Sequence, residues 1–390
     1  MTVSSHNHTD GSIGRPASYM NQLDTVRAVA VGMVIVSHWA PRAATFWFNG
    51  GFGVQLFFVI SGFLITGILL DARRRAGECG VPCSAVLRSF YARRILRIFP
   101  LFYGTLAIAF LLGHSSVRTY IWWLIPYLSN LLIAIHGEWI WGISHFWSLA
   151  VEEQFYLLWP VLILFTSRRL LLPLIASAIV FAPVYRFVCY VLGVNAITAG
   201  VLPFASLDTL GLGAILALLL RNRANDRKGR ALMILRVASI AGCLGYFALN
   251  IAGLFKGLPA LLYWLSTAMI APTVFGIVWL AARGVGGPIG WFMELNPLVY
   301  LGRISYGLYI LHPFIPTAVS KFCRVMRMPN VAILHPHYYF ALNLCVLVGA
   351  SSLSWHFFEK KINGLKRFFP YVPPPATDTQ TLLDHQLTGA

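Results

Sequence analysis

The stretch LDTVRAVAVGMVIVSHW, residues 23–39, decides how the rest of the chain is interpreted. Small and branched apolar residues fill it, as in a helix that faces lipid, but Arg27 stands near its start and His38 near its end. Eleven residues return to within about 20° of the starting direction, so both side chains share a face, about 16 Å apart along the axis. Ionisable groups inside a membrane usually face a cavity. The pair predicts a cavity with a cationic inner mouth and an imidazole farther out. A snorkelling arginine and a packing histidine are the alternatives.

The composition predicts an integral membrane protein. Of the 390 residues, 58% are hydrophobic and only 11% are charged, whereas a soluble domain has about 25% charged residues. The 30 Lys and Arg outnumber the 13 Asp and Glu, but they stand in short loops between apolar runs, which is typical of cytoplasmic loops. We therefore expect a lipid bilayer and no nucleic acid as partner. The six cysteines are scattered, and no metal site is predicted.

Ten apolar runs approach the roughly 20 residues that a membrane span needs. An eleventh, residues 119–135, is shorter and contains Pro126, so we expect a re-entrant or interfacial segment on the outer side. This choice puts the arginine-rich loops, including residues 221–230, on one side of the membrane. The sequence thus predicts an all-α polytopic protein of the cytoplasmic membrane, with both termini cytoplasmic and the helices around a central cavity. The expected spans lie near residues 24–41, 52–70, 95–113, 149–166, 169–189, 202–220, 231–251, 258–282, 298–320 and 338–358.

Three parts are expected along the chain. Residues 1–20 have no apolar core, so they are expected to form a disordered cytoplasmic N-terminus and not a cleavable signal peptide. Residues 21–360 are expected to form the transmembrane domain. Residues 361–390 are expected to form a cytoplasmic tail that is largely disordered, because its end is polar and rich in proline.

Two arginines at the start of the third span suit a phosphate-bearing ligand. In YARRILRIFP, residues 91–100, Arg94 and Arg97 are three residues apart and therefore neighbours on a helix. Guanidinium groups bind phosphates through two parallel hydrogen bonds. Anchoring to anionic lipid headgroups is the alternative explanation.

Two adjacent carboxylates stand out in HFWSLAVEEQFYLLWP, residues 145–160. Glu152 and Glu153 lie near the start of the fourth span, close to Ser148. Helix capping by the serine, with acids in the first turns, explains one carboxylate better than two. We therefore treat both glutamates as candidate site residues.

Further polar residues are expected inside later spans. Asp208 falls in the outer half of the sixth span, within FASLDTLGLGAI. The segment LGRISYGLYILHPF, residues 301–314, places Ser305, Tyr309 and His312 within the ninth span. Tyr309 and His312 are three residues apart and share a helix face. A functional role is favoured over a plain polar contact between helices.

The motifs along residues 20–360 resemble those of membrane-bound acyltransferase family 3. The most diagnostic are an arginine, ten residues and a histidine in the first helix, and the WSL-x-x-E-E-Q-F-Y block. The family often has glycine where this chain has Thr25 and Ala28, so helix packing there is expected to differ. Its optional extracytoplasmic hydrolase-like domain is not expected, because nothing of that size follows residue 360. In chain order the matching motifs are LDTVRAVAVGMVIVSHW, LFFVISGFLI, FYARRILRIFPLF, FWSLAVEEQFYLLWP, LDTLGLGAIL and ISYGLYILHPF.

The resemblance implies O-acylation, usually O-acetylation, of an extracytoplasmic or lipid-linked glycan. The implied donor is acyl-coenzyme A, chiefly acetyl-coenzyme A, and no bound cofactor is expected. Arg27, Arg94 and Arg97 would bind the donor at the cytoplasmic side, and His38 would act as the general base, a role that suits imidazole near neutral pH. Glu152 and Glu153 complete the expected catalytic set. The residues expected to support the site or contact the acceptor are Asp24, Trp147, Ser148, Asp208, Ser305, Tyr309 and His312.

Two alternatives stay open. Ser61, in VISGFLI, lies mid-membrane and is a candidate acyl relay, although serine in such helices more often bonds to its own backbone. No G-x-S-x-G motif occurs, which disfavours a hydrolase-type serine triad. A transporter or flippase for a glycan intermediate would also suit ten spans with intramembrane charge. However, the halves show no inverted repeat, and a transporter needs no paired arginines for a nucleotide-bearing donor.

Overall fold

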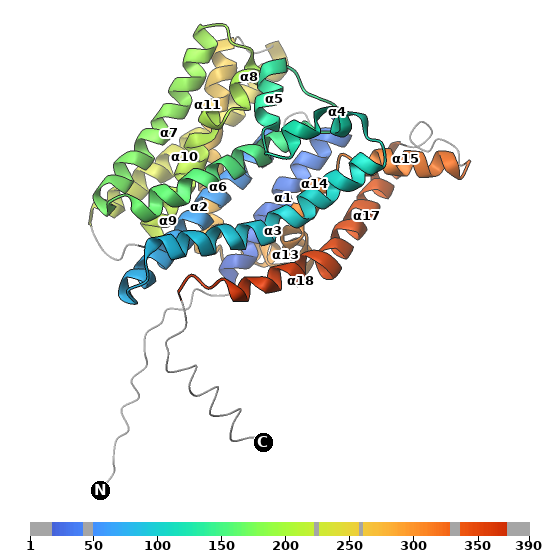
Figure 1. Cartoon of the computed structure of the whole chain (residues 1–390). Coiled ribbons are helices and arrows are strands. Elements are labelled where there is room, and N and C mark those ends of the chain that lie inside the picture. The colour runs from blue at the N-terminus through green and yellow to red at the C-terminus, as the bar shows by residue number, and fades with distance from the viewer. Residues whose placement is uncertain (1–17, 42–49, 222–225, 257–259, 328–335, 373–390) are drawn as a thin grey trace, which may run out of the picture.

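The computed structural model describes residues 18–41, 50–221, 226–256, 260–327 and 336–372. Nearly all of them are helical and no strand occurs among them (Figure 1), which confirms the predicted all-α fold. The longer helices are α1 (Ser18–Trp39), α2 (Gly50–Glu78), α3 (Cys83–Leu111), α6 (Phe146–Phe165), α7 (Arg168–Val191), α9 (Leu207–Arg221), α10 (Asp226–Lys256), α11 (Ala260–Arg283) and α17 (Pro336–Ser354). The shorter ones are α4 (Ser115–Leu124), α5 (Ser129–His136), α8 (Ala196–Gly200), η1 (Pro203–Ser206), α12 (Gly287–Met293), α13 (Asn296–Arg303), α14 (Ser305–Leu311), α15 (Ile315–Val325), η2 (Trp355–Glu359), α18 (Lys360–Gly364) and η3 (Leu365–Phe368).

In the part of the chain that the structure describes, fewer helices than the ten expected are long and apolar enough to span a membrane. Within the described ranges, seven are long and apolar enough, and an eighth is added if the pair 267–283 and 287–293, bent by 91°, counts as one span. The expected span 298–320 is instead divided among α13, α14 and α15, of 8, 7 and 11 residues. Each is shorter than a crossing needs. The helix α1, with 22 residues, is long enough to span a membrane. Its polar residues lower its mean hydropathy, so it is not among these seven helices.

The centre of the bundle is α2, which packs closely against α9. A Cβ added to Gly62 would collide with the backbone of Leu210, and one added to Gly213 would collide with the backbone of Val59. Glycine at both contacts therefore lets the two helix backbones touch, as in other membrane helix pairs. This close pairing leaves α1 and α6 to pack on the other sides of α2.

The segment expected not to cross the membrane is broken into α4 and α5. The break follows Pro126, where Tyr127 adopts a left-handed backbone conformation with φ of 57°. The two helices have 10 and 8 residues, so neither is long enough to span. Paired amide hydrogen bonds of 3.0 and 3.1 Å between Asn130 and Gln154 fix α5 to α6.

The first part of the tail that was expected to be largely disordered is helical, as far as residue 368. Here α18 and η3 run along α3, because Arg93 donates hydrogen bonds to the carbonyls of Lys366 and Phe369, at 3.0 and 3.2 Å. The hydroxyl of Ser89 donates to the carbonyl of Pro370 at 2.8 Å. Helical structure also begins at Ser18, inside the N-terminal segment that was expected to be disordered. Residues 1–17 and 373–390 lie outside the described part of the chain.

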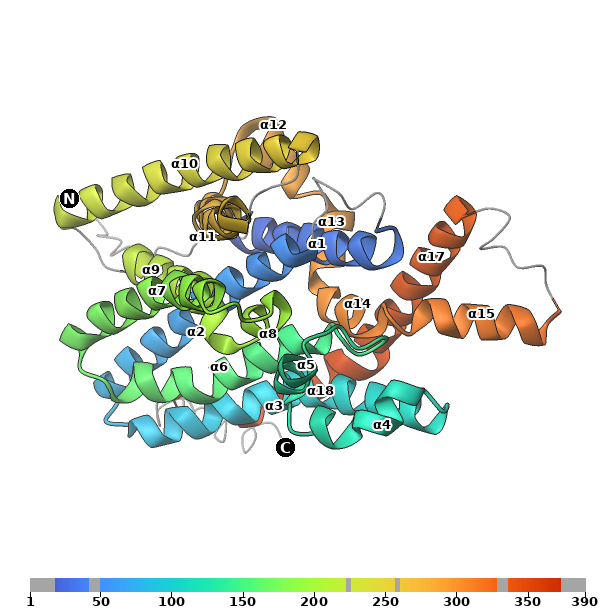
Figure 2. The same ribbon diagram turned by 90° about the horizontal axis from the view of Figure 1, so that it is seen from above.

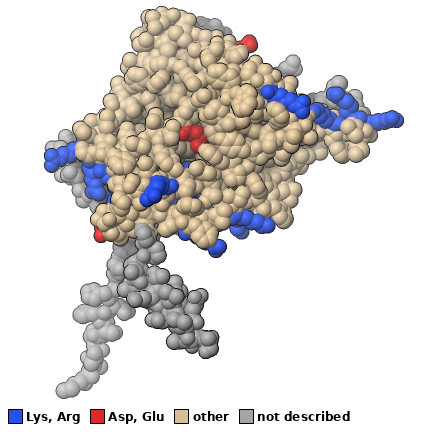
Figure 3. All heavy atoms as spheres, viewed as in Figure 1, with Lys and Arg blue, Asp and Glu red and all other residues tan. Residues whose placement is uncertain are grey.

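Basic side chains gather at two places on the face shown in Figure 3. One group lies near the ends of α7 and α9 and along α3 and α18, and the other lies near α15. Figure 2 shows α15 and the adjoining part of α17 projecting from the rest of the bundle. Lys321 and Arg324 belong to α15.

Candidate active site

A narrow cavity of about 110 Å³, here called the arginine cavity, brings together all three predicted donor-binding residues. Arg27 comes from α1, while Arg94 and Arg97 come from α3. Arg27 donates to the Asp24 carboxylate at 2.6 Å, and the guanidinium of Arg94 lies 4.9 Å from the ring centre of Tyr156. Arg97 is exposed to the cavity and forms no ion pair with any described residue. Arg97 is therefore the guanidinium most available to an incoming anion.

The helix α1 is held in this position by α13. A Cβ on Gly302 would collide with the backbone of Asp24, so glycine permits the helices to touch there. Arg303, the next residue, places its guanidinium 3.7 Å from the second carboxylate oxygen of Asp24. Asp24 thus orients Arg27 from within the same helix and ties α1 to α13.

Glu152 lies in the arginine cavity within a short hydrogen-bond chain. The hydroxyl of Tyr156 donates to Ser61 at 2.9 Å, and Ser61 donates to Glu152 at 2.5 Å. Both partners share the cavity lining with Glu152. The structure thus places Glu152 beside the candidate acyl relay, in a different cavity from His38. Ser61 does not bond to its own helix backbone, which was the ordinary explanation of a serine in an apolar helix.

A second, larger cavity of about 850 Å³ lies at the other end of α1 and contains His38, so it is here called the histidine cavity. Its lining is rich in tryptophan. Trp147 was expected from the sequence, and it packs against Trp139 with ring centres 6.4 Å apart. The remaining tryptophans of the lining are Trp39 and Trp141.

His38 is held by a backbone carbonyl and by a second histidine. Its Nδ1 lies 2.9 Å from the carbonyl oxygen of Val34 and 3.3 Å from Nε2 of His312. A carbonyl oxygen only accepts hydrogen bonds, so Nδ1 of His38 is assigned the proton and Nε2 keeps its lone pair. The same reasoning protonates Nδ1 of His312, which lies 2.7 Å from the carbonyl of Tyr309. His38 is exposed to the cavity, whereas His312 is fully buried.

Tyr309 stands where the two cavities meet, because it lines both, as does Val54. Its hydroxyl donates to the carbonyl of His145 at 2.9 Å. Since a phenol has one proton, Ser148, 2.5 Å away, is the donor in the bond between the two hydroxyls. The hydroxyl of Tyr309 therefore has no proton left to donate to an oxyanion. Tyr309 instead forms a fixed part of the wall at which the two cavities meet.

The other predicted residues fall inside and outside this pair of cavities. Ser305 is buried in the lining of the arginine cavity. Asp208 lines neither cavity, because its carboxylate pairs with Arg186 of α7 at 2.7 Å. Glu153 also lines neither cavity. One of its carboxylate oxygens is buried without a hydrogen-bond partner among the described residues.

Two residues without a predicted role complete the site. His145 is buried, and its ring centre lies 5.2 Å from that of His312, so three histidines gather behind Tyr309. No set of His, Cys, Asp and Glu side chains within the described ranges has the arrangement of a metal site. Tyr306 lines the arginine cavity. It lies three residues before Tyr309 on the same helix, a spacing that could have indicated it.

Sequence comparisons identify similar proteins. A family model described as an acyltransferase domain matches residues 20–356. The chain is 29% identical to a putative peptidoglycan O-acetyltransferase, YrhL, of Bacillus subtilis (strain 168), over 88% of this chain and 55% of that protein. It is 27% identical to the O-acetyltransferase OatA of Staphylococcus aureus (strain NCTC 8325 / PS 47), over 90% of this chain and 58% of that protein.

A third relative is the peptidoglycan O-acetyltransferase OatA of Listeria monocytogenes, which is 26% identical over 90% of this chain and 57% of its own length. The chain spans a little over half the length of the curated relatives that it matches. No solved structure matches the chain.

Proposed function

Because the chain belongs to this acyltransferase family, whose model covers residues 20–356, we propose that it is a membrane O-acyltransferase acting on a glycan. One observation supports this most: two cavities of different chemistry meet at Tyr309 and Val54. One cavity presents arginines and the other an imidazole. A thioester held from one side can thus meet a hydroxyl that arrives from the other.

We propose acyl-coenzyme A, chiefly acetyl-coenzyme A, as the donor. Its phosphates would bind Arg97 and Arg94, which line the arginine cavity. A cavity of about 110 Å³ is too small for a nucleotide but suits a thin pantetheine arm. Arg27 would guide that arm along α1 toward the boundary at Tyr309.

The proposed orientation puts the arginine cavity toward the cytoplasm and the histidine cavity toward the outside. Arg73, Arg168 and Arg221 lie at helix ends that follow or precede the short loops predicted to be cytoplasmic. In this orientation both termini are cytoplasmic. The donor and the acceptor then reach the site from opposite sides of the membrane.

His38 is the proposed general base. Its free Nε2 takes the proton of the acceptor hydroxyl while the hydroxyl oxygen attacks the carbonyl carbon of the thioester. The carbon–sulfur bond then breaks, and the acyl group stays on the sugar oxygen as an ester. The imidazolium returns the proton to the departing thiolate, so coenzyme A leaves as the thiol.

The histidine cavity is the proposed acceptor site. Its volume of about 850 Å³ and its tryptophans suit a sugar, which presents apolar faces between its hydroxyl groups. The names of the relatives in Bacillus subtilis and Listeria monocytogenes specify peptidoglycan as their acceptor. We accordingly propose a glycan acceptor for this chain, reached from the outer side.

The test uses purified protein with isotope-labelled acetyl-coenzyme A and a soluble glycan fragment. We expect labelled ester on the glycan, dependent on His38, together with release of the free thiol of coenzyme A. Proteoliposomes that take up the glycan without any acyl transfer would support the transporter instead. Labelled glycan formed equally well by His38→Ala would remove the proposed base.

A further inference from the structure

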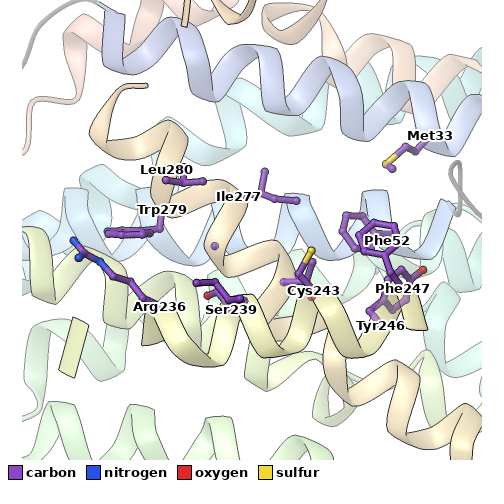
Figure 4. Close-up of a pocket in the computed structure, with 13 residues that line it drawn as sticks. Met33, Phe52, Arg236, Ser239, Cys243, Tyr246, Phe247, Ile277, Trp279 and Leu280 are labelled. Atoms are coloured by element: carbon purple, nitrogen blue, oxygen red, sulfur yellow. The ribbon is translucent and has the colours of Figure 1, made fainter. Parts of the chain in front are cut away.

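A separate groove of about 650 Å³ lies between α10 and α11, against α1 and α2 (Figure 4). None of its lining residues lines the arginine cavity or the histidine cavity. Its lining is almost entirely apolar, and the exposed side chains of Ile240, Ile277 and Leu280 lie along it. Such an apolar opening on the outside of a helix bundle faces the hydrocarbon of the bilayer.

At one end of the groove Arg236 and Trp279 belong to the lining, and Arg283, which does not line the groove, contacts the ring of Trp279. The guanidinium groups of Arg236 and Arg283 lie 4.8 and 5.4 Å from the ring centre of Trp279. Neither arginine forms an ion pair with a described residue. Trp279 is nine-tenths buried, and its indole N–H has no acceptor within the described ranges. A buried donor without a partner, on a ring that two unpaired guanidinium groups contact, suits an anion.

The other end is aromatic and apolar. Figure 4 shows Arg236 and Trp279 together at one end and Phe52, Tyr246 and Phe247 at the other. Arg236 and Phe247 are eleven residues apart on α10, which is about 16 Å along the axis. One leaflet of a bilayer has about 15 Å of hydrocarbon. The groove therefore matches a molecule with an anionic head and a chain of one leaflet's depth.

We propose that this groove binds an anionic phospholipid. The phosphate lies at Arg236, Arg283 and the indole N–H of Trp279, and one acyl chain follows the groove toward Phe52. A lipid without net charge would not neutralise the two arginines. A free phosphate would bind the arginines but would leave the apolar length of the groove unfilled. The chain would contact Met33, next to Val34 of the histidine cavity, so the lipid supports that wall of the site.

The test measures thermal unfolding of delipidated full-length protein in detergent, titrated with phosphatidylglycerol or phosphatidylcholine. We expect phosphatidylglycerol to raise Tm more. Arg236→Gln and Arg283→Gln should each weaken its apparent affinity about fivefold, the usual effect of one basic residue at an anionic lipid. Trp279→Phe keeps an aromatic ring, removes the N–H and should also weaken binding. The matched control Arg74→Gln, on an exposed arginine of α2 outside the groove, should leave the affinity unchanged.

Several results would overturn the proposal. Equal rises in Tm with the two lipids, or equal affinities for Arg236→Gln and Arg74→Gln, would exclude a headgroup site. A rise with inorganic phosphate that matches phosphatidylglycerol would indicate a soluble anion. Cys243→Trp fills the groove without changing charge, so retention of lipid binding by this variant would exclude the proposed chain position even if an arginine variant fails to fold. None of these measurements depends on acyl transfer.

Discussion

Replacing His312 by glutamine tests which member of the histidine pair is the base. Both ring nitrogens of His312 are engaged, by the carbonyl of Tyr309 and by His38, and its side chain is fully buried. His38 is exposed to the histidine cavity and keeps one nitrogen free. We therefore expect His312→Gln to leave the proton acceptor in place, whereas His38→Ala removes it.

The contacts of His38 determine how far kcat should fall in each of the two variants. The bond to His312 is long, at 3.3 Å, and the carbonyl of Val34 at 2.9 Å remains to hold the tautomer. Loss of one such hydrogen bond costs about 0.5–1.5 kcal/mol, so kcat for His312→Gln should fall about two- to tenfold. Loss of a positioned base costs on the order of 10²–10⁴-fold, which is the expectation for His38→Ala.

The assay follows initial rates of acyl transfer to a glycan fragment over a range of acetyl-coenzyme A concentrations. KM for the donor should stay near the parental value in both variants, because the proposed phosphate site lies at the far end of α1. His136→Gln is the matched control: this histidine makes the same type of contact to a backbone carbonyl at 2.9 Å but lines neither cavity. A folded His312→Gln protein that is as slow as His38→Ala would refute the assignment and make His312 the base.

Three further outcomes are expected. Arg97→Lys keeps the charge but loses the two-pronged geometry, so KM for acyl-coenzyme A should rise while expression is intact; an unchanged KM would leave Arg97 as a membrane anchor. If transfer is direct, Ser61→Ala should keep acyl transfer within about tenfold of the parental rate, and no acyl-serine should be found by mass spectrometry; an acyl adduct on Ser61 would establish a covalent relay with Glu152 as its proton acceptor. Single cysteines in residues 221–230, in a background without native cysteines, should resist an impermeant thiol reagent in intact cells, and labelling from outside would reverse the proposed orientation.

Features set by local sequence were the ones that could be predicted. The 3.6-residue repeat places Arg27 and His38 on one face, and each lines a cavity along α1, although these are two cavities and not the single one expected. The break between α4 and α5 could likewise be predicted from the sequence, because Pro126 cannot continue a regular helix. The pairing of Asp24 with Arg27 has the ordinary three-residue spacing and was accessible to the same reasoning.

Features set by helix neighbours were not predictable from periodicity. Asp208 was expected to support the site, but its partner Arg186 lies on α7, and nothing in either segment reveals that α7 packs beside that end of α9. The contact between His38 and His312 joins residues 274 apart. Hydropathy also failed at residues 298–320, because an apolar average does not register the helix breaks that divide α13, α14 and α15.

The pattern of partnered and unpartnered groups explains how one apolar helix bundle can hold this many ionisable residues. Burying a charged or polar group is costly unless a partner lies close by. Arg27 has Asp24, and Glu152 has Ser61, so these side chains are neutralised or hydrogen-bonded within the bundle. Arg97 and Nε2 of His38 have no such partner among the described residues, and one of them faces each cavity. That is the expected arrangement if the donor's phosphate and the acceptor's hydroxyl supply the missing partners, because a site that satisfied these two groups internally would have nothing left with which to bind or react.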